Sequence, residues 1–144
     1  MAAKKGEFSA KLAELTNEYL QMQHHLETYG SYSHDKVLFE IEELKNEILL
    51  KHTILQKSAE QAKSPIASFL AKSNLDYSTK ITGYLYKLTA ARSGLPEKAD
   101  KIALYSEYSI DCATLAIKQT LLSALISLDY QMQSDEKLVK SGNA

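Results

Sequence analysis

Hydrophobic positions recur every three or four residues along most of the chain, which is the spacing that places side chains on one face of an α-helix. The first such run has successive spacings of 4, 3, 4, 3, 4 and 3 and consists of Phe8, Leu12, Leu15, Tyr19, Met22, Leu26 and Tyr29. Gly30 follows this run and favours the end of a helix. The pattern predicts an amphipathic helix over about residues 8–29, preceded by a flexible N-terminus over residues 1–7.

A second helical run begins after Ser33, whose hydroxyl is suited to accept a hydrogen bond from a free amide of the first turn. Asp35 lies in that turn, where the helix dipole favours negative charge. The apolar positions of the run are Val37, Ile41, Leu44, Ile48, Leu55, Ala59 and Ala62. His52 falls on this stripe between Ile48 and Leu55, so we expect it to be at least half buried. The pattern predicts a helix that ends near Ala62.

The second half of the chain shows three further helical segments. Ser64 and Pro65 suit the start of a short helix of about two turns, because proline is favoured at the first helical position. Asp76 is a candidate cap for a further helix that ends at Gly94. From Pro96 the pattern is unbroken to about Gln133, and residues 134–144 are expected to form a frayed tail.

These elements predict an all-α fold, with no stretch of alternating polar and apolar residues to suggest strands. We expect an antiparallel up-and-down helical bundle of four main helices plus a short one, with a long C-terminal helix. The length of 144 residues suits one domain, and the bundle is expected to span residues 8–133.

Two helices carry more apolar surface than one neighbouring face covers. In the second helix Phe39, Leu50 and Ile54 lie away from the main stripe. The last helix has one apolar side with Ile110, Ile117, Leu121, Leu128 and Met132, and another with Leu104, Tyr108, Cys112, Leu115, Leu122 and Ile126. A third side carries only small residues: Ser106, Ser109, Ala113, Ala116, Thr120, Ala124 and Ser127. A monomer of four or five helices buries two such sides readily, but three with difficulty.

This excess predicts a protein that functions by association, most simply as a homodimer. The candidate interface residues are Phe39, Leu50, Ile54, Ser109, Ala113, Ala116 and Thr120. A second interpretation is a small adaptor, or a bundle similar to secretion chaperones, that binds an amphipathic helix of another protein. In that case Tyr32, Tyr86 and Tyr105 are candidate exposed anchors.

Composition narrows the possible partners. The net charge is −1 and Arg92 is the only arginine among 17 basic residues, so nucleic-acid binding is not expected. Cys112 is the only cysteine, which agrees with a reducing, cytoplasmic location. In the apolar part of the last helix, the longest uncharged run covers residues 119–128, about half of a bilayer span, so no membrane span is expected.

Catalytic and metal-binding patterns are missing from the sequence. No carboxylate stands three residues before any of the four histidines, as the di-iron pattern would require. Cys112 has no histidine or lysine one turn away that could activate its thiol as a nucleophile. We therefore expect no catalytic residue, no bound metal and no cofactor, with His52 and Asp111 as possible buried polar groups. A third interpretation, a ligand-holding bundle, would use His52, Asp111, or Glu18 with His25.

Overall fold

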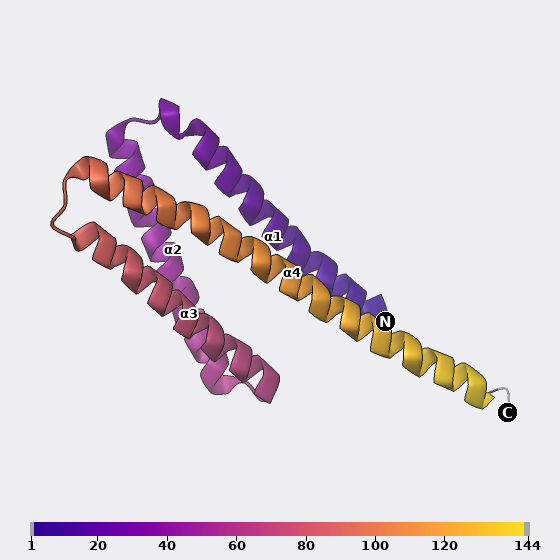
Figure 1. The fold of residues 1–144 in the computed structure, drawn as a ribbon. Helices are drawn as coiled ribbons and strands as arrows, with labels where there is room; N and C mark the ends of the chain where they lie inside the picture. The colour runs from indigo at the N-terminus through magenta and orange to yellow at the C-terminus, as the bar shows by residue number, and fades with distance from the viewer. Residues whose placement is uncertain (1, 143–144) are drawn as a thin grey trace. The chain divides into compact units, whose positions relative to one another are not determined.

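The computed structural model describes residues 2–142, with side chains described for all of these except residues 2–7 and Tyr29. The described residues form four α-helices and one short 3₁₀ helix, and they contain no strand (Figure 1). The helices are α1 (Ala2–Thr28), η1 (Tyr29–Ser31), α2 (His34–Gln61), α3 (Pro65–Ala90) and α4 (Leu95–Gly142). The predicted all-α class and the long C-terminal helix are confirmed.

The chain divides into two units, of which the first ends at Tyr77 and the second begins at Ser78. The boundary falls inside α3, so the first unit holds α1, α2 and the first half of α3. The second unit holds the rest of α3 together with α4. The bundle arrangement and the single domain over residues 8–133 remain predictions.

The start of α2 matches its predicted cap. Ser33 has an extended backbone, with φ −67° and ψ 156°, and its Oγ accepts a hydrogen bond from the amide of Lys36 at 3.2 Å. Asp35 lies in the first turn, where its carboxylate interacts favourably with the positive end of the helix dipole. The sequence prediction for this helix start is confirmed.

Replacing Ser33 with alanine removes this cap and leaves an amide of the first turn without its side-chain acceptor. We expect a loss of about 1 kcal/mol in the free energy of unfolding, measured by urea denaturation followed by circular dichroism. Ser31→Ala is the matched control, because the Ser31 hydroxyl donates to the Thr28 carbonyl and caps no helix start. Equal stability of the two variants would contradict the capping role.

Small residues mark the packing where α2 turns into α3. Ala59 and Ala71 are buried, and the Ser68 hydroxyl donates a hydrogen bond to the Ala59 carbonyl at 3.2 Å. Helices can approach closely where the facing side chains are this small. This corner is the best-packed part of the first unit.

The predicted break near Asp76 is wrong, because α3 is one continuous helix from Pro65 to Ala90. Its less exposed positions form a single helical stripe across the expected boundary: Ala71, Leu75, Ser78, Ile81, Leu85 and Leu88. Ser73, Asn74 and Asp76 are poor helix formers, but each costs only a few tenths of a kcal/mol within a helix. A continuous stripe outweighs that cost. Pro65 does start the helix, as predicted.

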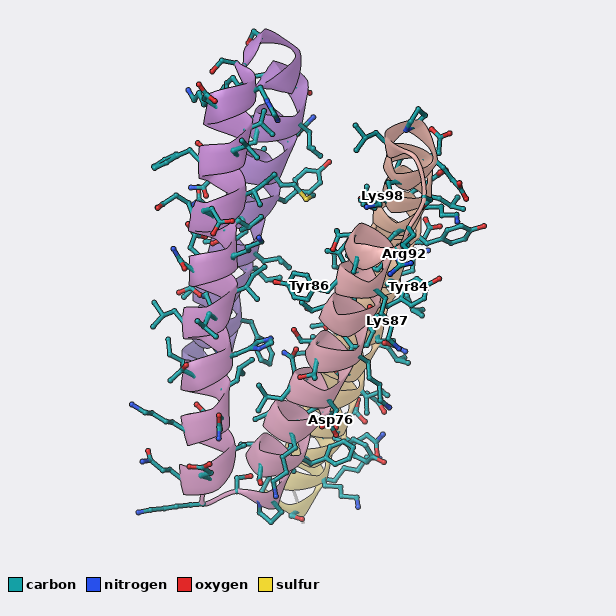
Figure 2. The ribbon with its side chains drawn as sticks, turned by 90° about the vertical axis from the view of Figure 1, so that its left-hand side faces the viewer. Asp76, Tyr84, Tyr86, Lys87, Arg92 and Lys98 are labelled. Carbon is teal, nitrogen blue, oxygen red and sulfur yellow. The ribbon has the colours of Figure 1, made fainter. Side chains whose placement is uncertain are left out.

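The second unit is a helical hairpin in which α3 turns into α4 around Gly94. The Lys98 ammonium donates to the Thr89 carbonyl at 3.0 Å, which places a positive charge at the negative end of α3. The Tyr105 hydroxyl donates to the Ile81 carbonyl at 3.0 Å, and its ring stacks on Tyr84 with ring centres 6.3 Å apart. Figure 2 shows Tyr84 on α3 together with Lys98 beside the turn. These contacts hold the hairpin together.

The expected end of α4 near Gln133 is wrong, because the helix continues to Gly142. Side chains one turn apart stabilise the extension, since Gln131 donates to Asp135 at 3.1 Å and Gln133 donates to Asp129 at 2.9 Å. Lys140 lies in the last turn, where a cation interacts favourably with the negative end of the helix dipole. The tail expected over residues 134–144 is therefore helical as far as it is described.

Candidate interaction surface

Most large apolar side chains of the described residues are exposed in the single chain. The accessible surface is 12,320 Å², whereas two compact units of this size would together expose about 9,000 Å². Ala59 and Ala71 are the only buried hydrophobic residues in the part of the chain that the structure describes. A large apolar area therefore has no cover within either unit.

The candidate interface residues of α2 are all exposed. Phe39 and Leu50 have 61% and 62% of their surface accessible, and Ile54 is also exposed. None of these side chains belongs to the stripe that carries His52 and Ala59. Ile41, Leu44 and Ile48 of that stripe are exposed as well, so the assignment of Phe39, Leu50 and Ile54 to an interface remains a prediction.

The larger candidate surface lies on α4. We call Ile110, Ile117, Leu121, Leu128 and Met132 the α4 seam. All five are exposed, with Leu121 at 58% and Leu128 at 42% accessible. Their spacing places them along one side of the helix, because residues 3, 4 or 7 apart share a face. The seam is a continuous apolar strip without cover in the second unit.

The small-residue side of α4 is less polar than its composition suggests. The Ser109 hydroxyl donates to the Tyr105 carbonyl at 2.8 Å, and the Thr120 hydroxyl donates to the Ala116 carbonyl at 2.9 Å. Each hydroxyl hydrogen is thus already bonded within the helix. Ser109 is partly buried, while Ala113, Ala116 and Thr120 are exposed. The Ser109 and Thr120 hydroxyls of this side therefore have no hydrogen left to donate to a partner.

The two candidate buried polar groups differ in their surroundings. His52 is partly buried, as its position on the α2 stripe predicted. Asp111 is exposed, against the expectation of burial. Asp111 lies on α4 on the side away from the Tyr105 contacts, so the α3 half of its own unit does not cover it.

The histidines near the end of α1 do not form the group that a metal site needs. Nδ1 of His25 lies 3.9 Å from Oε2 of Glu40 on α2, and the rings of His24 and His25 meet edge to face with centres 6.2 Å apart. Among the described residues there is no group of three or more His, Cys, Asp or Glu side chains that could hold a metal ion. The sequence did not indicate the His25–Glu40 pair, because it depends on how the α1–α2 turn folds.

The candidate tyrosine anchors are only partly available. Tyr86 is exposed, but Tyr105 is engaged with Ile81 and Tyr84, so its assignment as an exposed anchor is wrong. The Tyr32 ring lies under the Lys36 ammonium, 4.2 Å from the ring centre, and is partly buried. The Tyr105 hydroxyl reaches a carbonyl on the other helix of the hairpin. Helical spacing within one segment does not reveal such a contact.

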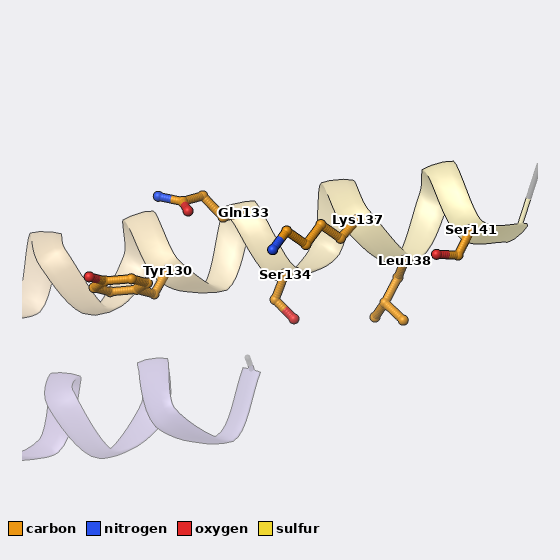
Figure 3. Close-up of a pocket in the computed structure, with 6 residues that line it drawn as sticks. All are labelled: Tyr130, Gln133, Ser134, Lys137, Leu138 and Ser141. Atoms are coloured by element: carbon orange, nitrogen blue, oxygen red, sulfur yellow. The ribbon is translucent and has the colours of Figure 1, made fainter.

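One shallow hollow lies near the C-terminal end of α4 (Figure 3). It is lined by Tyr130, Gln133, Ser134, Lys137, Leu138 and Ser141. All of these residues belong to the same helix, so the hollow is a groove between neighbouring side chains and is open to solvent. Tyr130 and Leu138 add two more exposed apolar groups beyond the seam.

Among the described helices, α4 is the one long and apolar enough, by length and composition alone, to cross a membrane. None of its apolar window is buried within the chain. A core helix of a water-soluble protein meets the same condition. The expected absence of a membrane span therefore remains a prediction.

Together these features define an all-helical protein whose helices present exposed apolar faces. No protein-family model matches the chain, and neither does any curated protein or solved structure.

Proposed function

We propose that this is a non-catalytic helical-bundle protein that functions by self-association, most simply as a homodimer in the cytoplasm. The observation that supports this most directly is the exposure of large apolar side chains along α2 and α4. An uncovered apolar strip of several hundred Å² is rare on a soluble monomer and is typical of a binding surface. Neither cofactor nor catalytic residue enters the proposal.

Helix lengths and short connections favour an antiparallel up-and-down bundle with an overhanging α4. α1, α2 and α3 contain 27, 28 and 26 residues, which corresponds to about 40 Å each. α4 contains 48 residues, or about 72 Å. Because short turns align the helix ends, about 20 residues of α4 would extend beyond such a bundle. This overhang begins near Leu122 and contains Leu128 and Met132.

Sedimentation equilibrium tests the proposal directly. We expect a mass twice the 16.1 kDa of the chain at micromolar concentration, and a thermal midpoint that rises with protein concentration, because association stabilises the folded state. If the protein stayed strictly monomeric at concentrations up to 100-fold higher, that result would contradict self-association.

A second function is supported by the same exposed surface. The α4 seam would also accept an amphipathic helix of another protein, as in an adaptor or a chaperone. A stoichiometric partner recovered from the native cell with the wild-type chain, and lost when Leu121 and Leu128 are changed to Asp, would favour this function over self-association.

A further inference from the structure

We propose that the covering partner of the α4 seam from Leu121 to Met132 is the same part of the seam of a second copy, running antiparallel and centred near Ile126 to Leu128. This inference rests on the proposed self-association and names its interface. The α2 surface around Leu50 is the competing site. Two properties of α4 distinguish the sites: the length of its exposed strip and the placement of its charges.

The length of α4 favours another α4 as its partner. If the chain forms the proposed bundle, no helix of the same chain extends beside the overhang from Leu122 to Gly142, because the other three helices are each about 30 Å shorter. The overhang of a second copy has the same length and the same apolar residues. A two-fold axis then covers both strips with one contact, which is the usual arrangement in homodimers.

Charges beside the seam support an antiparallel direction and a register centred near residue 127. Lys118 and Glu136 are 18 residues apart, which is five full turns, so they lie on the same line along α4. Leu121 and Leu128 of the seam lie next to this line. An antiparallel pair brings equivalent flanks of the two helices together. Lys118 of each copy then faces Glu136 of the other, and the contact contains two opposite-charge pairs.

The same register aligns the apolar residues. With the axis near residue 127, Leu121 lies beside Met132 of the second copy, and Leu125 lies beside Leu128. Asp129 faces Leu125 of the second copy, one helical turn along the flank from Asp129 of that copy. All four apolar side chains are exposed in the single chain and available for this contact.

Alternative arrangements pair the charges of this flank differently. Pairing Lys118 with Asp129 would move the axis to residues 123 and 124, where Glu107 would face Lys140 but Asp111 would face Glu136. A parallel pair would bring opposite flanks together, where Lys118 meets small uncharged residues such as Ala113 and Thr120. The antiparallel register on Lys118 and Glu136 pairs opposite charges and places no like charges directly opposite each other.

A charge exchange tests this register. Lys118→Glu or Glu136→Lys alone creates two like-charge pairs, and we expect the dimer Kd to rise roughly tenfold at about 50 mM salt. The double variant Lys118→Glu with Glu136→Lys restores both pairs, so its Kd should return to within about threefold of the wild type. A double variant as weak as the single variants, or single variants equal to the wild type, would overturn the inference.

A distance measurement on the native sequence provides a second test. Cys112 is exposed and is the only cysteine, so one spin label per chain marks a defined position on α4. The proposed register separates the two labels by about 50 Å, the Asp129 register by about 40 Å and a parallel pair by about 20 Å. A dimer with either shorter distance would contradict the register and would leave self-association intact. A monomer would contradict the proposed function itself.

Discussion

The double variant Leu121→Asp with Leu128→Asp should convert the dimer to a monomer, with a rise in Kd of at least about 10⁴-fold. Both residues belong to the α4 seam and are exposed in the single chain. In a symmetric dimer each substitution acts twice, so four buried leucines are lost at about 1.5 kcal/mol or more each. A total of about 6 kcal/mol corresponds to four factors of ten in Kd. The buried aspartates would add a further desolvation cost.

Sedimentation equilibrium across a thousandfold concentration range measures this effect. The matched control is Gln119→Asp with Ser123→Asp, which adds the same two charges to the opposite side of α4. We expect the control to dimerise like the wild type, and circular dichroism to show equal helix content in both variants. Dimerisation of the seam variant at wild-type affinity would exclude the α4 seam as the interface.

Loss of dimerisation in Leu50→Asp, together with a dimeric seam variant, would place the interface on α2 instead. Leu50 is the most exposed of the three α2 candidates and lies away from His52. This comparison separates the two surfaces without assuming either one. Self-association would stand in both cases, and only its location would change.

Helical periodicity predicted the elements of this chain well, because each helix carries its signal in its own residues. The cap at Ser33, the start at Pro65 and the great length of α4 all follow from local chemistry. The break expected at Asp76 is wrong because the stripe that continues from Leu75 through Ser78 outweighs the weak helix preferences around Asp76.

Contacts between helices could not be predicted from helical periodicity. The pairing of His25 with Glu40 and the hydrogen bond from Tyr105 to Ile81 join residues on different helices. Such pairs depend on turn geometry and on the rotation of each helix about its axis, and periodicity fixes neither of them. The exposed side of α4 was predictable, since apolar residues on several sides of one helix are visible in the sequence. The side chains that would cover these apolar residues could not be predicted from periodicity.

The second large effect is expected at Tyr105, where alanine should lower the free energy of unfolding by about 3 kcal/mol. The substitution removes a partly buried aromatic ring, its stacking on Tyr84 at 6.3 Å and the hydrogen bond to the Ile81 carbonyl. Aromatic pairs contribute about 0.5–1.5 kcal/mol, and one hydrogen bond about 1 kcal/mol. Loss of the apolar contact of the ring accounts for the remainder.

Two further variants separate these contributions. Tyr105→Phe keeps the ring and loses only the hydroxyl, so we expect a loss of about 1 kcal/mol. Tyr108→Ala is the matched control, because it removes the same side chain from an exposed position one turn further along α4. Its effect should be below about 1 kcal/mol, since little of that ring is covered. Urea denaturation at one fixed protein concentration measures all three, because association also changes the apparent stability. Equal effects of Tyr105→Ala and Tyr108→Ala would mean that Tyr105 does not hold the α3–α4 hairpin together.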